Sequence, residues 1–392
     1  MDYLKEIDQI FDELVEFRRD LHMHPELGYE EFRTQGKIFD ALKDTGLEVS
    51  KDYGNTGVLA TLYGQAGPGE TILIRADIDA LPIQEENDLA YCSQEPGKMH
   101  ACGHDIHTSI VLGLAKILAK HKDQIKGNIK FVFQPAEEIA PTGGAQMMID
   151  DGVMENPKVD RAYALHVWNN PLGTVAIRDG AMMAQSDRLS ITIKGKSSHA
   201  AQPQRGNDAI VAAAMVINAL QTVISRNTDP LESAVLTLGT INGGKKYNVI
   251  CDQVQIEGTV RLLSDEVIKN TKPLIERVAT NVAAGFGCQA IVNYTDGYAM
   301  TKNDHELFLM GKDRLEEEFG PENVLVPKNP NTGGEDFSAY GKHVPILFMW
   351  LGMESEMNKG KTTIHNKNLL INEDIIKNGI RAFIALLKDT NL

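Results

Sequence analysis

The chain has 392 residues, 42% of them hydrophobic and 24% charged, which is typical of a soluble globular protein with more than one core. Its formal net charge of −15 argues against a nucleic-acid partner, because binding phosphates requires a basic face. The four cysteines form no disulfide framework, so we expect a reduced, cytoplasmic chain. We find no signal-peptide pattern and no stretch that approaches the apolar length of a membrane span, so we expect no membrane partner.

The first half of the chain predicts helices alternating with buried strands. Helices are expected around residues 7–17 and 34–45, and strands at residues 57–63, 71–75, 129–133 and 161–165. The continuously apolar strand at 71–75 indicates burial on both faces of a sheet. Three of these strands lead into Asp77 and Asp79, into Glu137 and Glu138, and into His166. Because ligands bind beyond the carboxyl ends of strands in α/β sheets, we expect a functional site there.

From about residue 187 the pattern changes to half-exposed, alternating strands. Strands at 187–193, 234–241, 253–263 and 289–294, with helices at 207–225 and 265–285, give the β-α-β-β-α-β order of the split ferredoxin-like unit. A helix at 305–319, strands at 324–326 and 344–350, and a helix at 373–388 then resume the earlier alternation. We therefore predict an α/β catalytic domain over residues 1–182 and 298–392, interrupted by an inserted α+β domain over 183–297.

Metal-binding side chains are densest between Met99 and His107, where three imidazoles, one thiol and one carboxylate occur within nine residues. Cys102 and His104 are two residues apart, so in an extended loop both can point the same way, and Gly103 permits a tight turn. Thiolate and imidazole are the ligands that zinc and transition metals prefer. The alternative is a buried cysteine at a helix start with histidines on the surface, but the density of donors favours a metal site.

The candidate ligands of the whole chain are Cys102, His104, Glu138, His166 and His365. Five ligands exceed one tetrahedral ion but suit two ions that share a bridging ligand. Such a pair can polarise a carbonyl and hold a hydroxide between the ions. Glu137 is then the natural general base and could pass the proton to the leaving nitrogen. The predicted reaction is hydrolysis of an amide or peptide bond.

Six motifs in chain order resemble those of the dinuclear-metal amidohydrolases. They are RADIDALP (75–82), HACGHDIH (100–107), QPAEE (134–138), ALH (164–166), TGGEDF (332–337) and IHN (364–366). That family includes hippurate hydrolases, N-acetyldiaminopimelate deacetylases and indole-acetyl-amino-acid hydrolases, within the wider aminoacylase and carboxypeptidase metallopeptidase group. The resemblance implies a mixed-sheet α/β catalytic domain of zinc-exopeptidase type with a ferredoxin-like lid and dimerisation domain. It also implies two divalent ions per subunit, manganese or zinc, or else nickel or cobalt.

The resemblance also assigns residue roles. It implies that the five candidate ligands bind the ions, with Cys102 bridging, that Glu137 is the base, and that His100 and His107 are support residues. His199 would stabilise the carbonyl oxygen, often across a homodimer or homotetramer formed through the inserted domain. The remaining implied residues are Asn248, Arg261 and Gly334 as substrate contacts, and Asp77 as a support behind the ligands. Arg261 could pair with a carboxylate of a small-molecule substrate, although a strand arginine is usually a solvated residue.

The chain departs from the family pattern at several positions. Ser197 and Ser198 replace a common glycine pair, Gln204 a usual histidine, and Cys251 a usual proline. These changes leave the acyl-group preference open. Other branches of the wider group have a metal-binding histidine at the position of Arg75, which is why Asp77 is assigned a supporting role here.

The leading hypothesis is a hydrolase of N-acyl amino acids, or one that releases a C-terminal amino acid from short peptides. A dipeptidase or aminopeptidase on the same scaffold is an alternative, but an aminopeptidase needs an acidic group for the substrate ammonium, whereas Arg261 indicates a carboxylate. A catalytically silent metalloprotein is a second alternative. Glu137 argues against it, because a structural site needs no spare base. A redox or zinc-storage role is weak, since no Cys-x-x-Cys partner exists.

Overall fold

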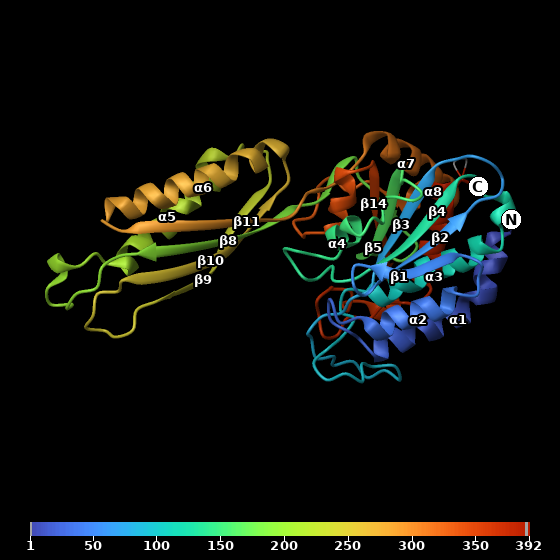
Figure 1. The fold of residues 1–392 in the computed structure, drawn as a ribbon, viewed down its shortest axis with the longest axis horizontal. Helices are drawn as coiled ribbons and strands as arrows, with labels where there is room; N and C mark the ends of the chain where they lie inside the picture. Colours follow the sequence, from blue (N-terminus) through green and yellow to red (C-terminus); the bar gives the residue numbers. More distant parts are fainter. Residues whose placement is uncertain (1, 389–390) are drawn as a thin grey trace. The chain divides into compact units, whose positions relative to one another are not determined.

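The computed structural model describes residues 2–388 and 391–392, and the chain divides into two compact units (Figure 1). Unit 1 comprises Met1–Met182, Thr301–Asn329 and Asp336–Leu392, and unit 2 comprises Met183–Met300 and Pro330–Glu335. Unit 1 contains a large mixed sheet with helices, and unit 2 a separate antiparallel sheet with two helices. The predicted fold class, a mixed-sheet α/β domain with a ferredoxin-like α+β insertion, is confirmed.

The sheet of unit 1 has the strand order β1-β2-β4-β3-β5-β14-β6-β13. Its strands are β1 (Glu48–Tyr53), β2 (Gly57–Tyr63), β3 (Thr71–Asp77), β4 (Asn128–Gln134), β5 (Arg161–Pro171), β6 (Val175–Ala176), β13 (Val324–Leu325) and β14 (Ile346–Glu354). β3 pairs in parallel with both β4 and β5, and β14 pairs in parallel with β5. The carboxyl ends of these four strands therefore lie along one edge of the sheet, where the predicted site residues follow them. β7 (Gly180–Met183) and β12 (Thr301–Asn303) form a separate two-stranded sheet.

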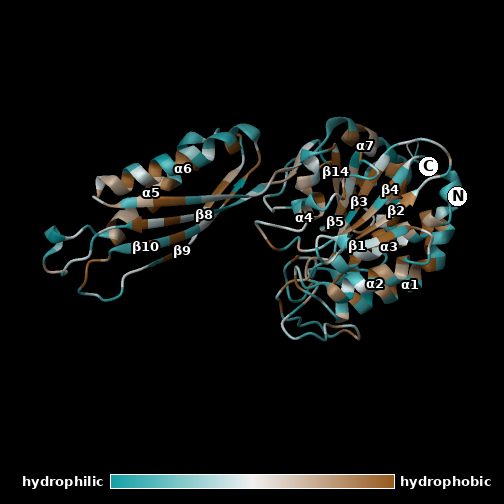
Figure 2. Cartoon of the chain, viewed as in Figure 1, coloured by the Kyte–Doolittle hydropathy of each residue, from teal (hydrophilic) through white to brown (hydrophobic). Residues whose placement is uncertain are grey.

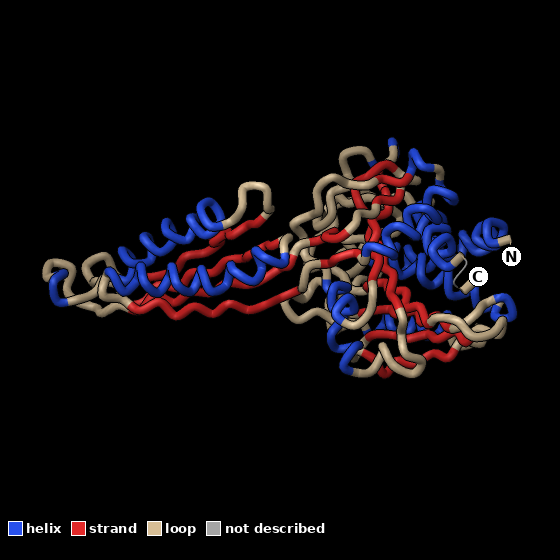
Figure 3. Tube along the Cα trace, turned by 90° about the horizontal axis from the view of Figure 1, so that it is seen from above, coloured by secondary structure: helices blue, strands red, loops and turns tan. Residues whose placement is uncertain are grey.

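Helices cover the large sheet and complete the core of unit 1 (Figure 3). They are α1 (Tyr3–Met23), α2 (Phe32–Leu42), α3 (His104–Ala119), α4 (Ala145–Asp150), α7 (His305–Phe319) and α8 (Ile375–Leu387). α3 packs against α1 and α8 and is almost entirely buried. Every residue of β3 is buried, as its continuous apolar run predicts, and apolar residues follow the strands of this sheet in Figure 2.

Two features of the large sheet differ from the sequence-based expectation. β1 was not predicted, because its polar run carries no clear alternation and it pairs only with β2 at the sheet edge. β5 does not stop before His166 but continues to Pro171. Its later residues stay in the sheet because they pair with β14, where His166 is in register with Trp350. His166 is thus a strand residue.

Unit 2 is a four-stranded antiparallel sheet with two helices. Its elements are β8 (Gln185–Lys194), α5 (Ala209–Asn227), β9 (Ala234–Gly243), β10 (Gln253–Leu262), α6 (Asp265–Gly285) and β11 (Gln289–Tyr298). The strand order β11-β8-β10-β9 and the antiparallel pairing are those of a ferredoxin-like sheet. Buried residues of both helices join alternate strand residues in a single core, so both helices cover the same face of the sheet.

One helix in the described part of the chain, α5, is long and apolar enough to cross a membrane by length and composition. This corrects the expectation that no segment approaches that length. Ala212, Val216 and Leu220 of α5 are fully buried in the core of unit 2. One face of α5 thus packs in the core of unit 2.

A buried carboxylate joins two strands of unit 2. Asp187 on β8 is 2% exposed and accepts hydrogen bonds from the Tyr294 hydroxyl at 2.6 Å and the Gly297 amide at 2.9 Å. Replacing Tyr294 with Phe is expected to lower the free energy of unfolding by about 1–3 kcal/mol, because the carboxylate loses a charge-assisted bond. Urea unfolding followed by circular dichroism would measure the change. Tyr247→Phe is the control, since Tyr247 is 95% exposed, and equal effects of the two substitutions would contradict the prediction.

Candidate metal centre

The densest cluster of metal-binding residues lies directly before α3. Gly103 is the N-cap of this helix, with a left-handed φ of +88°, and α3 begins at His104. A Cβ atom at Gly103 would lie 2.5 Å from Val167 Cγ2, so both the backbone conformation and the space require glycine. This turn carries Cys102 and His104, both buried, into the carboxyl edge of the sheet.

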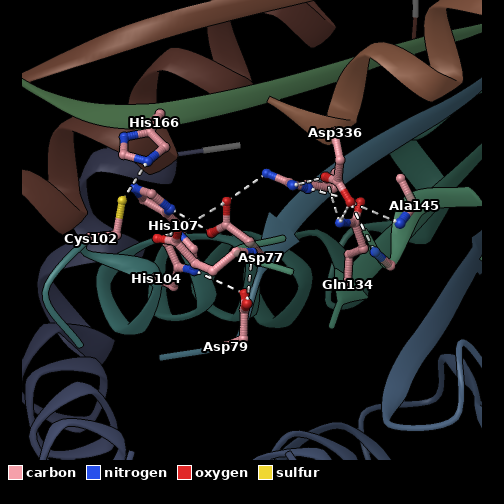
Figure 4. A network of polar contacts seen from close by, with 12 residues as sticks. Asp77, Asp79, Cys102, His104, His107, Gln134, Ala145, His166 and Asp336 are labelled. Carbon is pink, nitrogen blue, oxygen red and sulfur yellow. Dashed lines mark hydrogen bonds and ion pairs between the residues drawn. The ribbon is translucent and has the colours of Figure 1, made fainter. Parts of the chain in front are cut away.

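The sulfur of Cys102 belongs to two groups of potential ligand atoms. One group contains Cys102, His104 and His166, the other Cys102, Glu138 and His365, and the atoms within each group lie within 4.8 Å of one another. Cys102 Sγ is 3.3 Å from His166 Nε2, and His365 Nε2 is 3.1 Å from Glu138 Oε1. Figure 4 shows Cys102, His104 and His166 converging. The structure thus brings all five predicted ligands together within unit 1, around one shared sulfur.

The donor atoms of this site fit divalent cations. His104 Nε2 is buried and has no hydrogen-bond partner among the residues described. An unpaired buried polar group costs about 1–3 kcal/mol, and a bound cation would relieve that penalty for the imidazole nitrogen. Burial, followed by the nearby carboxylates of Glu138 and Glu137, raises the pKa of the Cys102 thiol well above its usual value. Its thiolate form therefore requires a neighbouring cation. One thiolate, three imidazoles and one carboxylate suit zinc or a transition metal.

Two buried aspartates, Asp77 and Asp79, form hydrogen bonds with His107 and His104. Asp79 Oδ1 lies 3.1 Å from His104 Nδ1, while Asp79 Oδ2 accepts the Glu138 amide at 2.9 Å. This contact leaves His104 Nε2 available to a metal. Asp77 Oδ1 lies 2.6 Å from His107 Nδ1, and His107 Nε2 accepts the Val167 amide at 2.9 Å. Asp77, His104 and His107 also form a close group, but both ring nitrogens of His107 already have partners.

A second buried network lies beside Asp77 (Figure 4). Arg75 donates to Asp77 Oδ2 at 2.6 Å and to Asp336 Oδ1 at 2.7 Å, and all three side chains are buried. Asp336 also accepts from the Gln134 amide at 2.8 Å and from the Ala145 backbone at 3.0 Å. Neither Asp336 nor Gln134 is among the residues predicted from the sequence to form the site. Their position inside the TGGEDF and QPAEE motifs is the sequence feature that could have indicated a role for them.

Glu137, the predicted base, follows β4 and is 7% exposed. Its carboxylate lies within 4.8 Å of the ligand atoms of His104 and Glu138. The residue before it, Ala136, has a left-handed φ of +55°. A buried carboxylate is therefore placed next to the candidate ligands without being one of the five.

The four remaining predicted site residues lie in unit 2; they are His199, Asn248, Arg261 and Gly334. None of the five predicted metal ligands belongs to unit 2. Arg261 Nη1 donates to Ser186 Oγ, and a Cβ at Gly334 would lie 2.7 Å from Ser186 Cβ, so Arg261 and Gly334 share a neighbour. The chain around His199 pairs with the chain around Asn248, since the Ala200 amide donates to Asn248 O at 3.1 Å. The proposed roles of these four residues stay predictions.

Comparisons with known proteins find a peptidase family model and relatives named as deacetylases that are similar to this chain. Residues 73–389 match the profile of peptidase family M20/M25/M40. The chain is 41% identical over 347 residues to an N-acetyl-L-cysteine deacetylase of Bacillus subtilis, covering 88% of this chain and 81% of the relative. It is 39% identical over 380 residues to an N-acetyldiaminopimelate deacetylase of Halalkalibacterium halodurans, covering 96% and 98%. The crystal structure of a Bacillus subtilis dinuclear metal-binding peptidase from the M20 family is similar with a TM-score of 0.84, at 33% identity and 97% coverage of both chains.

Proposed function

Since this chain belongs to peptidase family M20/M25/M40, we propose that it is a metal-dependent amidohydrolase that removes the acyl group from N-acyl amino acids. The observation that carries the proposal is the pair of ligand groups sharing Cys102, with the buried Glu137 carboxylate beside them. The identity of the ions is part of the proposal. Manganese or zinc fits the donor set, as do nickel and cobalt.

The residues of unit 1 have three proposed roles, which are metal binding, proton transfer and positioning of the ligands. Two divalent cations held by Cys102, His104, Glu138, His166 and His365 would polarise the amide carbonyl and acidify the attacking water. Glu137 takes the proton of that water and delivers it to the leaving nitrogen, which makes the amine a good leaving group. Asp79 keeps His104 and the Glu138 backbone in place during these transfers, through its bonds to both.

The residues of unit 2 would supply substrate recognition. We assign Arg261 to the free carboxylate of the substrate, because a guanidinium can form a bidentate pair with a carboxylate, with Asn248 and Gly334 as further contacts. His199 would donate to the carbonyl oxygen as negative charge develops there. We further propose assembly into a homodimer or homotetramer through unit 2. A cytoplasmic location is supported by four free cysteines, all within the described residues.

Two other functions receive less support. A dipeptidase or aminopeptidase on this scaffold would act on substrates with a free ammonium, whereas the two relatives named above are deacetylases of N-acetylated amino acids. A catalytically silent metalloprotein has no use for a buried carboxylate within 4.8 Å of His104 and Glu138.

The proposal is tested by hydrolysis of a panel of N-acyl amino acids and unblocked dipeptides. The protein is stripped with a chelator and assayed before and after manganese or zinc is restored. Metal-restored hydrolysis of N-acyl amino acids is the expected result. Preferential cleavage of dipeptides would favour the peptidase alternative, and no turnover in protein that binds two ions would favour the silent metalloprotein.

Replacing Cys102 with Ser is expected to weaken binding of both ions by at least ~100-fold, more than the loss of a typical support residue. The reason is that its sulfur is common to both ligand groups. Competition against a chromophoric chelator would measure the two affinities. Cys92→Ser is the matched control, since Cys92 is free and lies outside both groups. Wild-type affinity at either site of the Cys102 variant would show that the sulfur is not shared.

A further inference from the structure

The turn that carries Glu137 and Glu138 packs against residues Glu26 to Glu31, the segment that connects α1 to α2. This segment is fixed at its first residue, where Glu26 O accepts the Ala80 amide at 2.8 Å. The Glu26 carboxylate also accepts the Arg33 and Thr34 amides at the start of α2, at 3.0 and 2.7 Å. The segment is therefore anchored both to the chain after β3 and to α2.

Glu31 connects this segment to the turn. Its side chain is fully buried and accepts the Ala136 amide at 2.8 Å and the Thr56 hydroxyl at 2.6 Å. Burial raises the pKa of Glu31 to about 7, so the fold retains a carboxyl group in surroundings that disfavour its charge. The amide that it holds belongs to the residue directly before Glu137.

The backbone at Ala136 needs such a restraint. Its φ of +55° lies in the left-handed region, which a residue with a Cβ atom adopts only when its surroundings impose it. Gly28 lies directly against this turn, because a Cβ atom on Gly28 would lie 2.4 Å from Ile139 Cγ1 and 3.1 Å from Ala136 Cα. Ile139 N in turn donates to Ala136 O at 3.3 Å, which closes the turn around the two glutamates.

We propose that Glu31 and Gly28 are positioning residues that hold the left-handed Ala136 turn, so that Glu137 faces the reacting water while Glu138 faces the metal ligands. The inference rests on the proposed function of that site. It predicts that loosening the turn lowers kcat with little effect on KM, because the two residues act on the base and a ligand and touch no substrate-binding residue named above.

Three substitutions around the Glu31 carboxylate separate positioning from stability. Glu31→Ala is expected to lower kcat by ~10–100-fold with KM within about threefold, since a displacement near 1 Å can cost a factor of 10². Glu31→Gln should restore kcat to within about threefold, because its amide oxygen can still accept the Ala136 amide. Thr56→Val removes the other bond of the same carboxylate and should leave kcat unchanged. If Thr56→Val lowered kcat as much as Glu31→Ala, the inference would be overturned.

A pair of glycine substitutions tests the same turn without changing any charge. Gly28→Ala forces Ile139 or Ala136 to move and should lower kcat at least ~10-fold. Gly36→Ala in α2 is the matched control, since a Cβ there meets nothing within 4 Å. Unchanged kcat in both Gly28→Ala and Glu31→Ala, in folded protein, would overturn the inference.

Hydrogen–deuterium exchange of the peptide spanning residues 134–140 supplies a readout independent of activity. Exchange of the metal-loaded and chelated protein should accelerate in Glu31→Ala and remain near wild type in Glu31→Gln and Thr56→Val. An inactive wild type with this exchange pattern would overturn the proposed function and support the restraint on the turn. An active wild type with identical exchange in all variants would overturn the inference alone.

Discussion

Replacing Glu137 with Gln is expected to lower kcat for N-acyl amino acid hydrolysis by ~10²–10⁴-fold, with a small change in KM. Glutamine has nearly the same shape but cannot take a proton from water or return it to the leaving nitrogen. The carboxylate is 7% exposed and lies within 4.8 Å of the ligand atoms of His104 and Glu138, so no bulk solvent base can readily replace it. Steady-state kinetics with saturating manganese or zinc would measure the effect.

The control for this experiment is the neighbouring carboxylate. Glu137→Gln should still bind two ions, because the proposed ligand set does not include Glu137. Glu138 belongs to the group of Cys102 and His365, so Glu138→Gln should lose affinity for at least one ion. A kcat within threefold of wild type in Glu137→Gln would show that another group is the base. Loss of both ions in that variant would show that Glu137 is itself a ligand.

Replacing Arg75 with Met is expected to lower the free energy of unfolding by ~3–5 kcal/mol, the loss typical of breaking a buried ion pair. The guanidinium is 1% exposed and bonds Asp77 at 2.6 Å and Asp336 at 2.7 Å. Its removal leaves two buried carboxylates without their shared cation. Urea unfolding of the metal-free protein would measure the loss, and a value below about 1 kcal/mol would contradict it.

An exposed arginine in unit 2 provides the comparison. Arg188 pairs with Glu257 at 3.1 Å, and its side chain is 62% exposed. Solvent screens such a pair, so Arg188→Met should change the free energy of unfolding by only about 0–1 kcal/mol. The same substitution at the two positions therefore separates the effect of burial from the effect of losing an arginine.

Much of the candidate site could be predicted because its residues are marked locally. Cys102 and His104 lie in a dense cluster before a helix, and Glu138 follows a buried strand. Parallel pairing then brings the strand ends to one edge, which is a general property of such sheets. The two ligand groups around Cys102 agree with that reasoning.

The supporting contacts could not be predicted, because they depend on which distant segments dock. Arg75 and Asp336 are 261 residues apart, and no local pattern predicts that the Arg75 guanidinium donates to Asp336 as well as to Asp77. The segment Glu26 to Glu31 contains three acidic residues, and no local pattern predicts that Glu31 is the one that accepts the Ala136 amide. β5 likewise extends beyond its apolar residues to Pro171, because it pairs with β14, a strand far along the sequence.

The position of β14 between β5 and β6 has a consequence for the order in which a ribosome delivers this protein. The strands of unit 2 are complete by Tyr298, whereas the large sheet lacks an interior strand until Glu354 has been made. The ligand set lacks its last member until His365 has been made, and α8, which packs on α3, comes later still. The nascent chain therefore carries Cys102 through most of translation without the complete set of candidate ligands, and the candidate metal centre can be assembled only as synthesis ends.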